Sequence, residues 1–181
     1  MYQKLPPLTG GIKESNAGGS TGLLLSHLGI RAFILEGEPK SDQWQVLRID
    51  DKGGVFESAE DIYGLGVYDA SEKLVQRYGN KVGITLIGPG GEMGMYSAGV
   101  QNLDKDGVAS RICARGGLGA VMGSKRIKAI VIDAANDIDI DADGDNINLK
   151  YGDGVAAQLS ISNNASNVGE IIFQNKTNGK D

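Results

Sequence analysis

The feature that most constrains the fold of this chain is a dense cluster of glycine in the stretch ICARGGLGAVMGSK, from Ile112 to Lys125. Glycine loses more conformational entropy on folding than any other residue, so such a cluster needs a structural reason. The usual reasons are a tight turn, close packing of two backbones, or a backbone that must approach an anion. Arg111 and Arg115 stand at the start of the stretch, and Arg126 follows its end. The residues alone leave anion binding and tight backbone packing both open.

Two common phosphate-binding patterns do not match this stretch or its neighbour. The Walker A pattern needs Gly-Lys followed by Ser or Thr, whereas here Ser124 precedes Lys125. The dinucleotide pattern G-x-G-x-x-G would start at Gly88 and Gly90, but Met93 stands where its third glycine belongs. What remains is an unclassified glycine loop beside arginines, whose planar guanidinium groups suit bidentate recognition of phosphate.

The distribution of charge divides the chain into two parts. Residues 1–135 contain 15 acidic and 15 basic residues, whereas residues 136–181 contain 8 acidic and 3 basic residues, so the net charge of -5 lies entirely in the last quarter. We therefore predict one domain over residues 1–135 and an Asx-rich tail over residues 136–181, which forms short β-strands or is partly disordered. The negative charge and the low aromatic content (6%) argue against nucleic acid as a partner.

The hydrophobic pattern of the first part predicts an α+β domain with one or two mixed sheets and a few short helices. Glycine at the end of an amphipathic run indicates two helices, over residues 20–29 and 68–79. The sequence DKGG predicts a hairpin turn between two strands. The glycine stretch itself is expected to be a loop that enters a short helix. Strands are expected over residues 30–37, 43–50, 55–58, 81–90, 95–102 and 126–134.

Cysteine and histidine offer little metal or nucleophilic chemistry. Cys113 is the only cysteine, so the chain forms no internal disulfide, and a structural zinc site lacks ligands. Arg111 and Arg115 would lower the pKa of an exposed Cys113 thiol, and the alternative, a small buried residue, stays equally open. His27 is the only histidine, and on an apolar helix we expect it to be packed and hydrogen-bonded rather than catalytic.

The tail contains one run that is similar to a calcium-binding loop. In DIDADGDNINLK, aspartates alternate from Asp139 to Asp143 and precede Gly144, but Lys150 occupies the position of the closing glutamate. We therefore expect an acidic, solvated turn here. No apolar run is long enough to span a membrane, and a cytoplasmic location is the expectation.

Three motifs in order resemble the N-terminal domain of the aldehyde ferredoxin oxidoreductase family: PPLTGGIKESNAGG, IGPGGEM and RICARGGLGAVMGSKRIKAIVI. The resemblance runs from about Leu5 to Ala134. It implies a two-sheet α+β base, incomplete here at its N-terminus, on which a bis-pterin cofactor with tungsten or molybdenum lies. In the family, a magnesium ion joins the two pterin phosphates, glycines admit the pterin rings, and arginines and amides hold the phosphates.

By position, the resemblance implies a set of cofactor contacts. The backbone carbonyls of Asn16 and Ile112 would face the magnesium ion, and Gly119 would add close approach. The family often has Gly at the position of Ala114 and Ala at that of Ile112, changes that are tolerable where only backbone groups contribute. The implied cofactor-binding residues are Asn16, Gly18, Arg111, Ile112, Ala114, Arg115, Gly116 and Gly117.

The family's activity is the oxidation of aldehydes to carboxylic acids with ferredoxin as electron acceptor. Its further domains hold a [4Fe-4S] cluster on four cysteines and contact the substrate, and one cysteine here cannot bind that cluster. We therefore assign no catalytic residue and expect this chain alone to be inactive. The alternatives are a non-catalytic binding or assembly subunit, as a homodimer or beside a cysteine-bearing partner, and a truncated remnant of the family.

Overall fold

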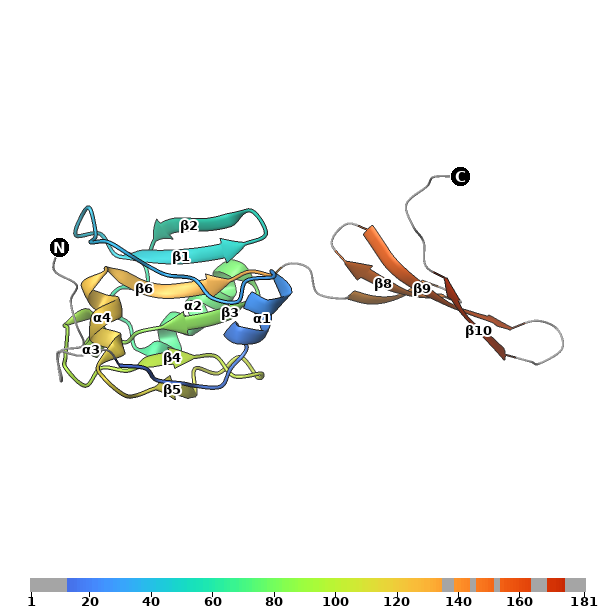
Figure 1. Ribbon diagram of the computed structural model, residues 1–181. Helices are drawn as coiled ribbons and strands as arrows, with labels where there is room; N and C mark the ends of the chain where they lie inside the picture. The colour runs from blue at the N-terminus through green and yellow to red at the C-terminus, as the bar shows by residue number, and fades with distance from the viewer. Residues whose placement is uncertain (1–12, 135–138, 144–145, 152–153, 164–168, 175–181) are drawn as a thin grey trace. The chain divides into compact units, whose positions relative to one another are not determined.

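The computed structural model describes residues 13–134 and the backbone of four strands in the tail, and the other residues are not described. The chain divides into two compact units, residues 1–134 and residues 135–181. Each unit has its own sheet (Figure 1). The part of the chain that the structure describes contains no helix with the length and apolar character needed to cross a membrane.

The first unit is built on a six-stranded mixed sheet with the strand order β2-β1-β6-β3-β4-β5. Only β1 and β6 run parallel, and every other neighbouring pair is antiparallel. The α+β class with a mixed sheet and short helices is therefore confirmed. The described residues of this unit form one sheet, and not the two that the family resemblance implies. The strands are β1 (Gln45–Asp50), β2 (Gly53–Ser58), β3 (Gly83–Leu86), β4 (Val100–Asn102), β5 (Arg111–Cys113) and β6 (Ile127–Ile132).

The core of this unit lies on both faces of its central strands. All six residues of β6 are buried, because β1 and β3 flank this strand and helices cover the sheet. Helix α1 (Thr21–His27) lies in front of the sheet in Figure 1, and α2 (Val67–Tyr78) lies behind it. The short helices α3 (Pro89–Glu92) and α4 (Leu118–Ser124) pack together at one end. The completely buried side chains include Val46, Ile62, Leu74, Ile84, Leu86 and Val131.

Helix ends and the hairpin agree with local sequence signals. Gly29 and Gly79 follow α1 and α2 with φ of 71° and 88°, a backbone conformation that glycine adopts without strain. Hairpin β1–β2 pairs Asp50 with Gly53 across the predicted turn. Strand β3 ends at Leu86, earlier than expected, because Gly88 and Pro89 begin α3.

The predicted strand over residues 30–37 is wrong. This segment has no regular structure, and Ile34 is 83% exposed. A strand needs a neighbouring backbone that completes its hydrogen bonds, and no described strand pairs with this segment. The expected strand over residues 95–102 is also reduced to the three residues of β4.

The second unit contains a four-stranded antiparallel sheet in the order β10-β9-β8-β7. Its first two strands pair Asp143 with Asn146, so most of the calcium-like run is a pair of antiparallel strands. Residues 144–145 of that run lie outside the described residues. The strands are β7 (Asp139–Asp143), β8 (Asn146–Tyr151), β9 (Gly154–Asn163) and β10 (Gly169–Gln174).

Candidate cofactor-binding site

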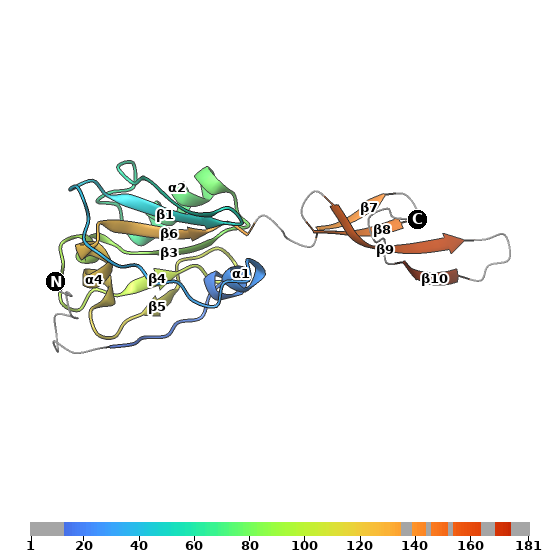
Figure 2. The same ribbon diagram turned by 45° about the horizontal axis from the view of Figure 1, so that its top comes forward.

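Two segments about a hundred residues apart in sequence meet at the β5 edge of the sheet. The N–H of Arg115 donates a hydrogen bond to Oγ of Ser15 at 3.3 Å. A Cβ built at Gly18 would lie 4.0 Å from Cδ of Arg111. Figure 2 shows the extended chain that precedes α1 running beside β5. The structure therefore brings the two groups of sequence-predicted residues, 16–18 and 111–117, into one neighbourhood.

The position of the first segment is set where it reaches α1. The N–H of Ser20 donates to the carbonyl oxygen of Leu103 at 3.0 Å. Gly19 has a φ of 131°, and a Cβ there would lie 2.5 Å from the same oxygen. Only glycine tolerates that backbone conformation and that approach. Residues 13–19 are thereby held next to the end of β4.

Glycine also shapes the loop after β5. Gly116 and Gly117 are both left-handed, with φ of 78° and 69°, and α4 begins directly after them. A Cβ at Gly116 would lie 2.7 Å from Cβ of Lys13, so the turn and the close approach both require glycine here. Neither amide donates a hydrogen bond to another described residue. The turn therefore leaves the N–H groups of half-buried Gly116 and buried Gly117 without a hydrogen-bond partner among the described residues.

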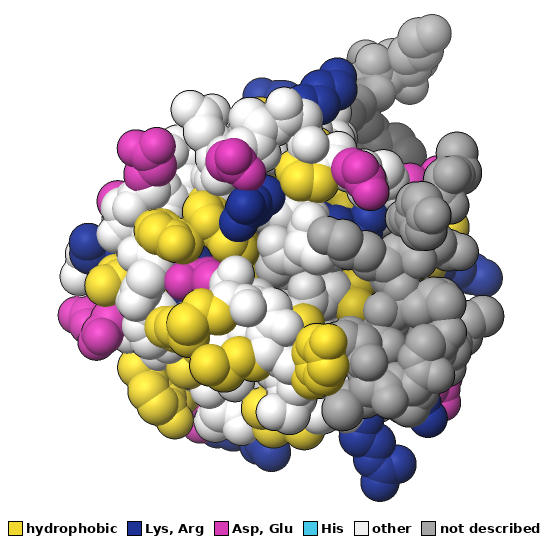
Figure 3. Space-filling view, turned by 90° about the vertical axis from the view of Figure 1, so that its left-hand side faces the viewer, with side chains coloured by type: hydrophobic (Ala, Val, Ile, Leu, Met, Phe, Trp, Pro, Cys, Tyr) yellow, Lys and Arg dark blue, Asp and Glu magenta, His cyan; other side chains and the backbone are white. Residues whose placement is uncertain are grey.

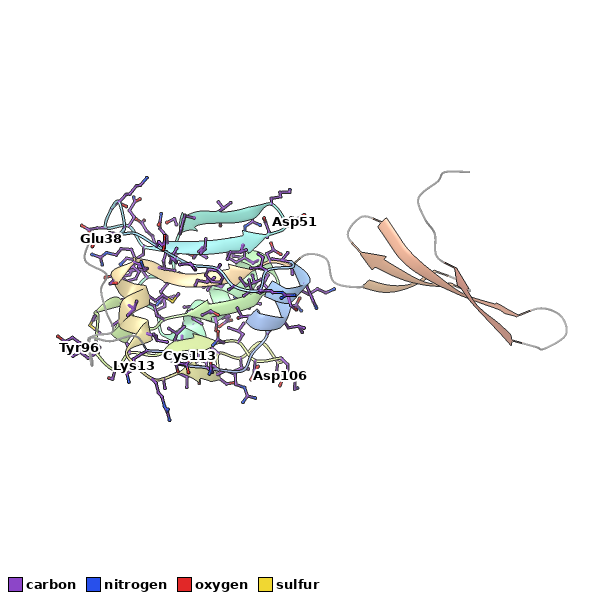
Figure 4. All side chains as sticks on the ribbon, in the orientation of Figure 1. Lys13, Glu38, Asp51, Tyr96, Asp106 and Cys113 are labelled. Carbon is purple, nitrogen blue, oxygen red and sulfur yellow. The ribbon has the colours of Figure 1, made fainter. Side chains whose placement is uncertain are left out.

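Three exposed cations lie along the two adjoining segments. Lys13, Arg111 and Arg115 are exposed, and none forms an ion pair with another residue of the described chain. In Figure 4, Lys13 and Cys113 lie on the β4–β5 side of the sheet, away from Asp51 in the β1–β2 hairpin. Unpaired guanidinium and ammonium groups beside free amides form a donor set suited to an anion.

The cations at the other end of the glycine stretch have structural partners instead. Nζ of Lys125 donates to the carbonyl oxygen of Gly37 at 2.8 Å. Arg126 donates to Asp42 at 2.9 Å and lies over the ring of Trp44. These contacts fasten the irregular segment around residues 37–44 to the end of α4. Lys125 and Arg126 are therefore separate in role from Arg111 and Arg115.

Two further glycines of the stretch serve backbone packing. A Cβ at Gly119 would lie 2.4 Å from the carbonyl oxygen of Gly99, and one at Gly123 would lie 2.0 Å from that of Gly91. Both glycines are buried, and the N–H of Gly119 donates to Ala98 at 2.9 Å. Gly119 thus faces protein backbone, which corrects the expectation that it admits a cofactor. Backbone packing therefore accounts for Gly119 and Gly123, whereas Gly116 and Gly117 form the turn beside the cations.

Cys113 lies at the end of a chain of polar side chains that sequence reasoning missed. Thr21 and Thr85 share a hydrogen bond at 3.1 Å, and Thr85 donates to Oδ1 of Asn102 at 2.5 Å. Nδ2 of Asn102 then donates to Sγ of Cys113 at 3.9 Å. The Cys113 side chain is half-buried, which lies between the buried and the exposed alternatives. A polar residue at an otherwise buried strand position, such as Asn102, is the only signal that the sequence offers for this chain.

The sequence prediction also did not include Ser15, Lys13 and Gly19, although they belong to the same motif as Asn16 and Gly18.

The expectation that His27 is packed and hydrogen-bonded is wrong, because this side chain is exposed and has no hydrogen bond to a described residue. Helix α1 buries only Leu24 fully, so most of its surface faces outward. No group of three potential metal ligands among His, Cys, Asp and Glu occurs within the described residues.

The fold is shared with a domain of a known oxidoreductase. A chain of the active site complex of benzoyl coenzyme A reductase, solved with 1,5-dienoyl-CoA, superposes with a TM-score of 0.64 and 25% sequence identity. The match covers 72% of this chain and 19% of that one. The class defined by the fold is therefore an α+β domain of the kind found in large reductases.

Sequence comparison is more specific. Residues 3–134 match the family described as aldehyde ferredoxin oxidoreductase, N-terminal domain. The tungsten-containing aldehyde ferredoxin oxidoreductase of Pyrococcus abyssi is 40% identical over 127 residues, 70% of this chain and 20% of that protein. The Pyrococcus furiosus protein of the same name is 36% identical over 135 residues, 74% of this chain and 21% of that protein. The chain belongs to the aldehyde ferredoxin oxidoreductase family, and it spans about a fifth of the length of these relatives.

Proposed function

We propose that this domain binds the phosphate end of a bis-pterin cofactor in a tungsten- or molybdenum-dependent oxidoreductase that converts aldehydes to carboxylic acids and passes electrons to ferredoxin. The proposed contacts come from the loop after β5 and from the segment before α1. Carbonyl oxygens of Asn16 and Ile112 would face a magnesium ion between two phosphates. The proposed cofactor-binding residues are Asn16, Gly18, Arg111, Ile112, Ala114, Arg115, Gly116 and Gly117.

The observation that carries the proposal is the convergence of unpaired cations and free amides from two distant segments. Arg111 and Arg115 are exposed and form no ion pair within 4 Å with a described residue, although the charge of Arg111 contributes to the lowered pKa of Asp104, and Lys13 lies against Gly116. Exposed cations that serve only solubility need no ordered contact with a second segment. Here Ser15 and Gly18 line the arginines on one side. A phosphate group, which has several acceptor oxygens and negative charge, fits this donor set.

The side chain of Ile112 is compatible with the proposal. It is 47% exposed and packs toward Gly99, where a Cβ would lie 2.9 Å from its Cδ1. Ile112 thus occupies space provided by a glycine within the protein. Its contribution to a bound cation would come from the backbone carbonyl, which is independent of the side chain.

In the proposed mechanism, the residues of this chain bind and orient the cofactor. The two-electron chemistry would be supplied by the metal and pterin when bound. Arg111 and Arg115 would neutralise phosphate charge and fix the position of the cofactor, while Gly116 and Gly117 would donate N–H groups to its oxygens. No described side chain is proposed as a general acid or base.

The residues present do not fit a [4Fe-4S] cluster. Four thiolates hold such a cluster, and the whole chain contains only Cys113. Electron transfer to ferredoxin would therefore need protein outside this chain, and we propose that the 181-residue chain alone does not oxidise aldehydes. The test is reduction of ferredoxin by the purified chain with an aldehyde and added cofactor; turnover would refute this part.

A second candidate is a non-catalytic binding or assembly subunit, as a homodimer or beside a cysteine-bearing partner. The observation that favours it is a set of large apolar side chains more than half exposed beside α3 and in the segment before α2: Tyr63, Met93, Met95 and Tyr96. Figure 3 shows hydrophobic side chains gathered on one face of the domain. Exposed apolar residues gathered on one face are typical of interaction surfaces. Copurification with a larger cysteine-bearing protein would support this candidate, and a tagged chain recovered alone would count against it.

Binding of pyrophosphate with Mg²⁺, measured by isothermal titration calorimetry, tests the central proposal. Replacing Arg111 or Arg115 with Met should weaken binding about tenfold or more, because a hydrogen bond to a charged group contributes about 1.5–3 kcal/mol. Lys125→Met is the matched control, since it removes one cation from the other end of the same stretch. Equal losses in all three variants, or no binding by the unmodified chain, would refute a phosphate site at the β5 edge.

A further inference from the structure

The central strand of the sheet contains a completely buried lysine. Lys128 lies in β6 with no exposed side-chain surface, and its Nζ lies 2.5 Å from Oε1 of Glu92, whose side chain is 5% exposed. An ammonium group loses its hydration when buried and is tolerated only with a charged or hydrogen-bonding partner. In the sequence of β6, IKAIVI, this position is marked only as an interruption of an apolar run.

The Lys128–Glu92 ion pair also binds a third part of the chain. Nζ of Lys128 donates to the carbonyl oxygen of Leu65 at 2.9 Å. Both carboxylate oxygens of Glu92 accept a hydrogen bond from the N–H of Gly64 at 3.1 Å. The pair therefore joins β6, the end of α3 and the segment before α2 through directional bonds.

Helix α3 packs directly against α4, so the position of α3 affects that of α4. Gly91, next to Glu92, lies so close to α4 that a Cβ there would be 3.0 Å from the carbonyl oxygen of Gly119. On the other helix, a Cβ at Gly123 would be 2.0 Å from the carbonyl oxygen of Gly91. With backbone against backbone at two points, a displacement of α3 must displace α4.

We propose that the Lys128–Glu92 ion pair positions the loop 114–117 for anion binding, acting through α3 and α4. Helix α4 starts directly after Gly117, so its placement sets where the loop amides and Arg115 lie. Stability alone does not require the two charges, because apolar side chains of similar volume often stabilise a buried site equally well or better. The directional bonds to Gly64 and Leu65 fix α3 in a way that apolar contacts do not. This inference rests on the proposed function of the β5 edge.

The test uses the full chain and a double variant, Lys128→Met with Glu92→Met, which removes both charges and keeps much of the volume. Hydrogen–deuterium exchange is followed by mass spectrometry in peptides covering residues 111–118 and 45–58. We expect exchange in 111–118 to rise about tenfold while 45–58 stays within about twofold. Pyrophosphate affinity should fall by about tenfold as well.

A control variant separates positioning from a general loss of stability. Arg48→Met removes the cation that binds Glu57 and Asp133 at 3.0 Å and 3.1 Å on the β1–β2 side of the sheet. It should leave exchange in 111–118 and pyrophosphate binding unchanged. If the double variant raises exchange in both peptides equally, or leaves both 111–118 and the affinity unchanged, the inference is wrong.

Two further outcomes are distinguishable. If the unmodified chain binds no pyrophosphate, the proposed function fails, whereas selective exchange in 111–118 still decides whether the pair positions the loop. If the double variant does not fold, Glu92→Asp keeps both charges but shortens the carboxylate side chain. Selectively faster exchange in 111–118 then supports positioning, and exchange equal to that of the unmodified chain overturns it.

Discussion

Gly123 of α4 rests directly on the backbone of Gly91 in α3, and a Cβ at Gly123 would lie 2.0 Å from the Gly91 carbonyl oxygen. Carbon and oxygen atoms that are not bonded do not approach so closely, so the contact exists only because position 123 lacks a side chain. The relationship explains one part of the glycine stretch without any ligand. It also makes the spacing of the two helices sensitive to a single methyl group.

Gly123→Ala should therefore lower the free energy of unfolding by about 3 kcal/mol or more, because the overpacked helices must separate. Gly22→Ala is the matched control, since Gly22 also lies within a helix and a Cβ there meets nothing within 4 Å. It should change stability by no more than about 1 kcal/mol, in the stabilising direction. Urea unfolding monitored by the fluorescence of Trp44, the only tryptophan, measures both. Similar losses in the two variants would contradict the packing account.

Glu92→Gln should destabilise the fold by about 3–5 kcal/mol, because it leaves the ammonium group of Lys128 buried without its charged partner. Adding Lys128→Met to the same variant should recover a large part of that loss. The measurement is a double-mutant cycle from urea unfolding curves of the four proteins. Additive losses would show that the two charges are not coupled.

The affinity for pyrophosphate should fall as salt concentration rises, because exposed Arg111 and Arg115 are screened by counterions. The double variant Arg111→Met with Arg115→Met should bind weakly and with a much shallower dependence on salt. Titrations across a series of NaCl concentrations, with the Lys125→Met variant as control, measure the slopes. A slope in the double variant as steep as in the unmodified chain would assign the binding to other cations.

Lowering the pH should reduce the stability that the loop after β4 contributes to the fold. The hydroxyl of Ser110 donates to Oδ2 of Asp104 at 2.7 Å, and the N–H of Val108 donates to Oδ1, which together hold the pKa of Asp104 below its usual value. Because the pKa is lower in the folded state, the unfolded chain binds more protons below about pH 4, and stability falls as the pH drops through the folded pKa.

The variant Ser110→Ala removes the first of these donors, so its melting temperature should depend less on pH between about pH 6 and pH 3 than that of the unmodified chain. Ser41→Ala, in an exposed turn elsewhere, is the control and should retain the full dependence. Thermal melts at a series of pH values make the comparison. Parallel curves for all three proteins would mean that Asp104 does not contribute.

Local signals in the sequence account for the elements whose stability is itself local. An apolar face followed by glycine predicts α1 and α2, and DKGG predicts the β1–β2 hairpin, because each depends on residues within one or two turns of chain. The segment Ile30–Gly37 has an equally good strand pattern, yet it is not a strand. The apolar pattern indicates which side chains the segment could bury as a strand. Whether a strand forms depends also on a neighbouring strand to pair with, and the local sequence does not specify that neighbour.

The motif similarity placed Asn16, Gly18 and residues 111–117 in one predicted site, and the structure brings these segments together. Neither their spacing nor their composition indicates the contacts of Ser15 with Arg115 or of Lys13 with Gly116. Such contacts depend on how β5 pairs with β4 and where α1 docks, which are long-range properties of the fold.

By itself, the sequence determined the α+β class, the family, the division of charge along the chain and the absence of four thiolates for an iron–sulfur cluster, because composition and motifs decide these. Only the tertiary structure decided which glycines form a turn and which allow two helices to touch. It also decided that Arg111 and Arg115 form no ion pair within 4 Å with a described residue, while Lys125 and Arg126 bind Gly37 and Asp42. The physical reason is that a glycine or a charge acquires its role from the atoms packed against it. Those atoms come from segments that are distant along the chain.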